Sequence, residues 1–80
     1  MKLPRDLSGA ALVQHLGRRW RYRQVHRVGS HVTLETTDPV RHRIVVPDHA
    51  HLRVGTLSAI LRSVARAKGV ARSEILEGIR

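Results

Sequence analysis

The chain has no cysteine and no phenylalanine, and its 80 residues include only one tryptophan, one tyrosine and one methionine. Without cysteine it can form neither disulfide bonds nor thiolate metal sites. No apolar run approaches the roughly 20 residues that a membrane-spanning helix needs. Residues 1–6 also lack the apolar segment of a signal peptide. These absences predict a cytoplasmic protein with no membrane partner.

Acidic residues and lysine are scarce as well. Fifteen Lys and Arg residues stand against six Asp and Glu, which gives a formal net charge of +9, and only Lys2 and Lys68 are lysines. A positive field of this kind attracts polyanions, and the planar guanidinium group of Arg matches phosphate oxygens. The charge favours a nucleic-acid partner over the alternatives, a solubilising surface or a basic face for an acidic protein.

A chain of 80 residues is long enough for one domain, 1–80, with a thin core. Its hydrophobic pattern predicts the α+β class in the order α-β-β-β-α-α. Helices are expected over residues 8–18, 55–68 and 72–79, and strands over residues 20–28, 31–37 and 41–46. Consecutive strands with short turns predict a three-stranded antiparallel sheet. The helices should cover one face of this sheet and leave the other to solvent or a ligand.

Three short motifs follow one another along the chain: GSH at 29–31, IVVPDH at 44–49 and GTLSAIL at 55–61. Together they resemble the HicA family of small bacterial toxins, over about residues 7–79. The resemblance implies a fold like the double-stranded-RNA-binding domain and an endoribonuclease that cleaves mRNA without a metal or another cofactor. It also implies a HicB-type antitoxin that neutralises the toxin. The family's single catalytic histidine falls on His31.

The chain departs from the family pattern at helix ends. The family usually has glycine directly before the aromatic residue that opens the first strand, whereas here Arg21 precedes Tyr22. The second long helix extends through residues 66–68, and Ala71 takes the place of the family's capping serine before the last helix. These differences concern local geometry and leave the histidine motif intact.

The residue types around His31 suit RNA cleavage. The 2′-hydroxyl of RNA is a built-in nucleophile, so the reaction needs a base, an acid and donors that hold negative charge on phosphorus. Histidine exchanges protons near neutral pH, and His31 opens a strand on the face that the helices should leave open. Gly29 lets the backbone approach a phosphate closely, and the amides of Ser30 and His31 can bind it. The plainer interpretations are an exposed strand histidine and a turn serine.

Five arginines are the candidates for substrate binding. Arg21, Arg23 and Arg27 are expected on one face of the first strand. Arg41 and Arg43 are expected together on the third strand. Two interpretations stay open: these side chains form a track for RNA phosphates, or they receive the acidic antitoxin.

Other polar side chains have alternative roles. Glu35 shares the face of His31, where it either orients a base or, as we expect, pairs with an arginine. Trp20 and Tyr22 either stack on bases or, in a chain without phenylalanine, belong to the core. Thr56 is expected to cap the long second helix, as Ser8 caps the first.

The remaining histidines predict no metal site. Residues 42, 49 and 51 are histidines, but the chain offers no cysteine and no histidine pair spaced four apart. His49 is expected to hydrogen-bond within its loop, and His15 and His26 are expected on the surface.

Two other functions compete with the enzyme. One is a non-catalytic RNA-binding module with the same fold, and the other is a DNA-binding regulator, for which no helix-turn-helix spacing is present. The Gly-Ser-His motif favours the enzyme. The last helix of a true double-stranded-RNA-binding domain usually begins with several lysines. Residues 55–65 of this chain contain one basic residue, Arg62, and no lysine.

Overall fold

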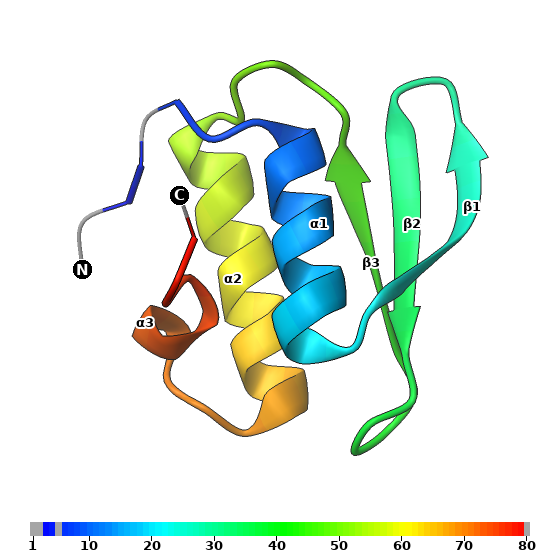
Figure 1. The fold of residues 1–80 in the computed structure, drawn as a ribbon, viewed down its shortest axis with the longest axis vertical. Helices are drawn as coiled ribbons and strands as arrows, with labels where there is room; N and C mark the ends of the chain where they lie inside the picture. Colours follow the sequence, from blue (N-terminus) through cyan, green and yellow to red (C-terminus); the bar gives the residue numbers. More distant parts are fainter. Residues whose placement is uncertain (1–2, 5, 80) are drawn as a thin grey trace.

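The computed structural model describes residues 3–4 and 6–79. Its elements are α1 (Gly9–Trp20), β1 (Arg23–Val28), β2 (His31–Thr36), β3 (His42–Pro47), α2 (Val54–Lys68) and α3 (Arg72–Ile75). The strands form one antiparallel sheet in the order β1-β2-β3 (Figure 1). This arrangement confirms the predicted α+β class and element order. No helix in the described ranges has the length and apolar character to cross a membrane.

The core lies between one face of the sheet and the two long helices. Alternate strand residues, such as Val32 and Leu34 of β2, are buried on this face. Each helix turns an apolar stripe toward them, represented by Leu12 and Leu16 of α1 and by Leu61 of α2. The opposite face of the sheet, which we call the open face, carries no helix, as predicted.

The start of α1 is fastened to the end of β3. Ser8 caps the helix as predicted, and its hydroxyl accepts a hydrogen bond from the amide of Ala11 at 3.0 Å. The amide of Gly9 donates to the carbonyl oxygen of His49 at 2.9 Å. A side chain at Gly9 would not fit, because its Cβ would lie 1.9 Å from the carbonyl oxygen of Pro47. Glycine therefore allows the helix to approach the sheet here.

Several predicted boundaries are wrong by one to four residues. Helix α1 continues past Gly17 to Trp20, because the indole N–H of Trp20 bonds the carbonyl oxygen of Ile75 at 2.9 Å and holds the last turn against α3. Helix α2 begins at Val54, and its N-cap is Arg53 without a side-chain hydrogen bond, so Thr56 is not the cap. The last helix spans only four residues of the predicted eight, 72–79.

Candidate functional site

His31 occupies the first position of β2 and is exposed. The next residue, Val32, points into the core with 3% of its surface exposed, so His31 points to the open face. It pairs with Val28 of β1 and Pro47 of β3. This placement agrees with the predicted position, a strand start on the side away from the helices.

Cross-strand pairs arrange the open face in three rows. The rows are Val28–His31–Pro47, His26–Thr33–Val45 and Arg23–Glu35–Arg43. Paired residues on neighbouring strands share a face of the sheet. The open face therefore has two histidines toward one end and guanidinium groups at the other.

A bulge in β1 decides which basic residues reach this face. The register shifts between Gln24 and His26, so Val25 has no partner in the ladder. Arg23 lies on the open face opposite Glu35, whereas Arg27 pairs with Val32 and points to the helix side. The prediction that Arg21, Arg23 and Arg27 share one strand face is therefore wrong.

Arg27 braces the turn that precedes His31. Its Nε donates to the carbonyl oxygen of Gly29 at 3.0 Å, and its terminal nitrogen binds a carboxylate oxygen of Asp48 at 2.8 Å. The amide of Asp48 in turn donates to the carbonyl oxygen of Ser30 at 2.6 Å. Gly29 adopts a positive φ of 55°, which glycine accommodates without strain. These contacts link the 29–30 turn to the end of β3, and substrate contacts of Gly29 and Ser30 stay predictions.

Glu35 binds two of the predicted arginines with one oxygen. Its Oε2 accepts hydrogen bonds from the Nε of Arg41 at 2.7 Å and of Arg43 at 2.9 Å. These bonds hold the pKa of Glu35 below its ordinary value. The sequence-based expectation that Glu35 pairs with an arginine and that Arg41 lies beside Arg43 is confirmed, although Arg41 precedes β3.

The two guanidinium groups keep most of their donors for a ligand. The side chains of Arg41 and Arg43 are 69% and 54% exposed, respectively, and each uses its Nε for Glu35. Arginine carries five N–H donors, so the bond from Nε to Glu35 leaves the four donors on the terminal nitrogens of each side chain available. The cluster of Arg23, Arg41, Arg43 and Glu35 has a net charge of +2 and lies on the open face.

Arg21 lies outside the sheet. It forms the C-cap of α1 in the left-handed conformation, with φ 60°. Its guanidinium group is 3.6 Å from Asp38, and its side chain is 80% exposed. The prediction of a strand position is wrong here because α1 runs on to Trp20.

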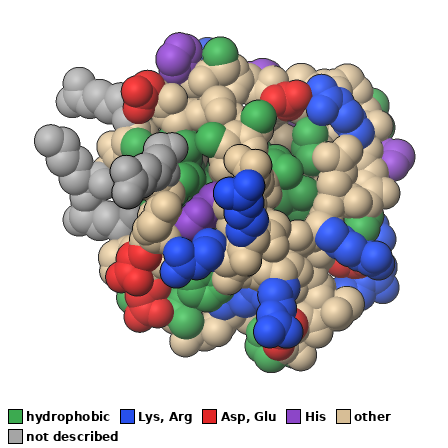
Figure 2. Space-filling view, in the orientation of Figure 1, with side chains coloured by type: hydrophobic (Ala, Val, Ile, Leu, Met, Phe, Trp, Pro, Cys, Tyr) green, Lys and Arg blue, Asp and Glu red, His purple; other side chains and the backbone are tan. Residues whose placement is uncertain are grey.

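All four ion pairs among the described residues involve arginines that sequence reasoning selected. Other exposed arginines make no ion pair with the described residues: Arg18, Arg19, Arg53, Arg62 and Arg66. Figure 2 shows Lys and Arg side chains across the middle of this view and Asp and Glu side chains mostly toward its rim. Helical periodicity, which puts Arg18 and Arg19 of α1 and Arg62 and Arg66 of α2 outside the apolar stripes, would have identified these four as further exposed basic residues.

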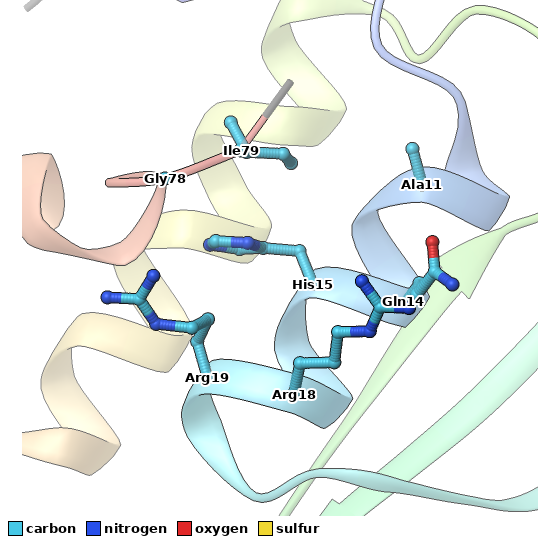
Figure 3. A pocket seen from close by; sticks show the side chains of 7 residues that line it. All are labelled: Ala11, Gln14, His15, Arg18, Arg19, Gly78 and Ile79. Carbon is cyan, nitrogen blue, oxygen red and sulfur yellow. The ribbon is translucent and has the colours of Figure 1, made fainter.

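His15 is buried, so its predicted surface position is wrong. Its Nε2 lies 2.6 Å from the carbonyl oxygen of Ile75, the same oxygen that Trp20 binds. Only an Nε2–H tautomer can donate to a carbonyl. The ring reaches from α1 toward the C-terminal segment and lines a cavity with Arg19 and Gly78 (Figure 3). His15 therefore fastens α3 to α1.

His42 is a bridging residue between the sheet and α2. Its Nδ1 lies 2.8 Å from the hydroxyl of Tyr22, and its Nε2 lies 3.0 Å from the hydroxyl of Ser63. Burial, and then the charge of Lys68, lower the pKa of His42, while burial raises the pKa of Tyr22 to about 12. A neutral imidazole can donate one hydrogen bond and accept one, so His42 can bond both hydroxyls. Tyr22 belongs to the core, as expected.

No three histidine, aspartate or glutamate side chains among residues 3–4 and 6–79 are grouped so that they could hold a metal ion. The loop histidines 49 and 51 are both exposed. Within the part of the chain described, the only hydrogen bond of His49 is made by its backbone carbonyl. The predicted side-chain bond of His49 within its loop is thus absent.

Comparison of the chain with protein-family models, with curated proteins and with solved structures finds no match. A functional assignment therefore depends on three things: the motifs, the open face and the charge.

Proposed function

We propose that the protein is the toxin of a toxin–antitoxin system, a metal-independent endoribonuclease that cleaves mRNA with His31 as its catalytic histidine. One observation carries the proposal. His31 is exposed on the uncovered face of the sheet, and the Arg23, Arg41 and Arg43 side chains lie on that same face. A proton-transfer group and phosphate-binding groups are thereby available to one bound strand.

The chemistry follows from this arrangement. An RNA backbone that crosses the open face would bring one phosphate to His31 while neighbouring phosphates meet the guanidinium groups. The terminal nitrogens of Arg41 and Arg43 form charge-assisted hydrogen bonds of the kind that phosphate oxygens accept. Histidine transfers protons at neutral pH. The 2′-hydroxyl of RNA supplies the nucleophile, so the residues of this face need no metal ion.

The position of Arg21, where this chain departs from the HicA family pattern, supports the resemblance. Where the family usually has glycine, Arg21 adopts a left-handed conformation with φ 60°. Glycine reaches this region at the least cost. The backbone at this position is thus one that glycine adopts readily, although the side chain here differs from the family pattern. A fold like the double-stranded-RNA-binding domain is part of the same proposal.

The proposed partners are mRNA and a HicB-type antitoxin in the cytoplasm. An acidic protein that covers the open face would neutralise the +2 cluster and bury His31. The same surface would then serve RNA and antitoxin in turn. This competition predicts that antitoxin and RNA do not bind together.

A non-catalytic RNA-binding domain is the second candidate, and one observation favours it. The imidazole of His31 makes no hydrogen bond to the described residues. A catalytic base is commonly oriented by a further group, and here only the substrate is left to do so.

The decisive experiment incubates the purified protein with a long unstructured RNA in excess EDTA. Cleavage to fragments with 2′,3′-cyclic phosphate ends supports the proposed ribonuclease. RNA binding without cleavage, with or without divalent ions, supports the non-catalytic domain. Loss of cleavage on chelation, with recovery when Mg²⁺ is added, would overturn the metal-independent mechanism.

A further inference from the structure

His26 and His31 lie on adjacent rows of the open face. His26 pairs with Thr33, and His31 pairs with Val28, so the two histidines are diagonal neighbours on β1 and β2. Diagonal neighbours on an antiparallel pair have Cα atoms about 7–8 Å apart, with Cβ atoms somewhat closer. Both side chains are exposed. The space between the rings is therefore open to a ligand.

The bulge at Val25 puts His26 and His31 on the same face of the sheet. Without it, strand alternation would place His26 on the face opposite Arg23, on the helix side of the sheet. The register shift between Gln24 and His26 turns His26 to the open face together with Arg23. An irregularity that re-aims one side chain is a common use of bulges beside active sites.

We propose that His26 is the second proton-transfer group of the ribonuclease, so that His26 and His31 act as an acid–base pair on one phosphodiester. This inference rests on the proposed function and extends it from one histidine to two. One neutral imidazole takes the proton of the 2′-hydroxyl as the 2′-oxygen forms its bond to phosphorus. The other, protonated, gives its proton to the 5′-oxygen as the bond from phosphorus to that oxygen breaks. The products are a 2′,3′-cyclic phosphate and a 5′-hydroxyl, and one proton is taken up for each one released.

The charged groups that face this pair come from all three strands. Arg23, Glu35 and Arg43 form the next row, and Arg41 joins them through Glu35. The carboxylate of Asp48 is held by Arg27, which points to the helix side of the sheet, away from this pair. The helices lie on the other face and contribute no titratable group here. A pair of this kind gives a bell-shaped dependence of kcat/KM on pH, because one member must be neutral and the other protonated.

The test compares His26→Gln, His31→Gln and, as control, His51→Gln, which replaces an exposed loop histidine. On ordinary RNA we expect losses of about 10²–10⁴-fold for the first two variants and wild-type rates for the third. Each of the two should also lose one limb of the bell-shaped pH profile. A second substrate with a 5′-bridging sulfur has a leaving group that departs without a proton. On it, the variant that lacks the acid should recover to near the wild-type rate, while the variant that lacks the base stays slow.

A readout independent of activity uses an uncleavable 2′-O-methyl RNA of the same sequence. Its binding should shift the imidazole NMR signals of His26 and His31 and leave those of His51 unchanged. Wild-type cleavage with an unaltered rate and pH profile for His26→Gln would overturn this inference and leave the proposed function standing. Absence of cleavage by the wild-type protein would overturn both.

Discussion

Arg21 adopts a backbone conformation that costs an L-residue free energy and glycine almost none. Its φ of 60° closes α1, and the amide of Tyr22 then reaches back to the carbonyl oxygen of Leu16 at 3.2 Å. The left-handed region costs a non-glycine residue roughly 1–2 kcal/mol. The ion pair with Asp38 offsets little of this cost, since both side chains are largely exposed.

Arg21→Gly should therefore raise the free energy of unfolding by about 0.5–1 kcal/mol, the relief of strain less the added chain entropy of glycine. Urea unfolding measures this difference. Arg23→Gly is the matched control, because Arg23 lies in β1 with an extended backbone, and it should destabilise by about 0.5–1 kcal/mol. Equal changes in the free energy of unfolding for the two substitutions would show that the left-handed conformation of Arg21 carries no cost.

Glu35 makes stability depend on pH. Its folded pKa lies below its ordinary value of 4.5, chiefly because Arg41 and then Arg43 hydrogen-bond the carboxylate. A lowered carboxyl pKa stabilises the folded state fully above the unfolded pKa, and this contribution is lost as the pH falls through the folded value. The wild-type protein should thus lose more stability than Glu35→Gln on acidification below pH 4.5. Urea midpoints from pH 7 downward test this, and parallel curves would contradict it.

At the scale of elements, the approach of α1 to β3 depends on one missing side chain. Gly9→Ala would bring a Cβ within 1.9 Å of the Pro47 carbonyl oxygen, which is backbone and cannot rotate away. We expect a loss of about 1–3 kcal/mol or more. Gly55→Ala is the control, because a Cβ there meets nothing within 4 Å. That substitution in α2 should stabilise by up to about 1 kcal/mol, and thermal unfolding of both variants distinguishes the two environments.

The elements that sequence predicted best are those with complete local signals. Helix α2 has an apolar stripe from Leu57 to Ala65 and ends at Lys68 with Gly69 as its C-cap, as predicted. The apolar pattern predicts a last helix that is too long, because Leu76 and Ile79 pack on the core although they lie beyond the end of α3. The end of α1 was missed because its last turn is held by α3, a contact between segments far apart in the sequence.

The candidate site was only partly predictable for the same reason. The open-face position of His31 followed from alternation with Val32 and Leu34. The position of His26 did not, because nothing in the residues around Val25 signals the bulge that turns it. His15 was assigned to the surface from its polarity, although it lies one turn from Leu12 on the same helix. Periodicity was the better guide at that position.

At the scale of the whole molecule, the net charge of +9 predicts RNA binding that weakens with salt. If Arg23, Arg41 and Arg43 each bind one phosphate of a single strand, the slope of log affinity against log salt should be about −2. Affinity would then fall roughly 20-fold for a fourfold rise in salt. Fluorescence anisotropy with a labelled RNA measures the slope.

The same titration distinguishes the open face from the helices as the surface that binds RNA. Arg43→Ala should make the slope less negative by about 0.7, the share of one phosphate contact. Arg62→Ala, on the exposed side of α2, should leave the slope unchanged. An affinity of the wild-type protein that does not change with salt would remove the electrostatic argument for RNA as partner. A slope that changes with Arg62→Ala but not with Arg43→Ala would show that RNA binds to the helices.

The most direct test of the central claim is RNA cleavage by purified His31→Ala, in EDTA, beside His49→Ala. Both histidines are exposed, so both variants should melt at the wild-type temperature. We predict that His31→Ala loses about 10²–10⁴-fold in rate, while His49→Ala retains wild-type cleavage. Full cleavage by folded His31→Ala, or loss of cleavage with His49→Ala alone, would contradict the assignment of His31 as the catalytic histidine.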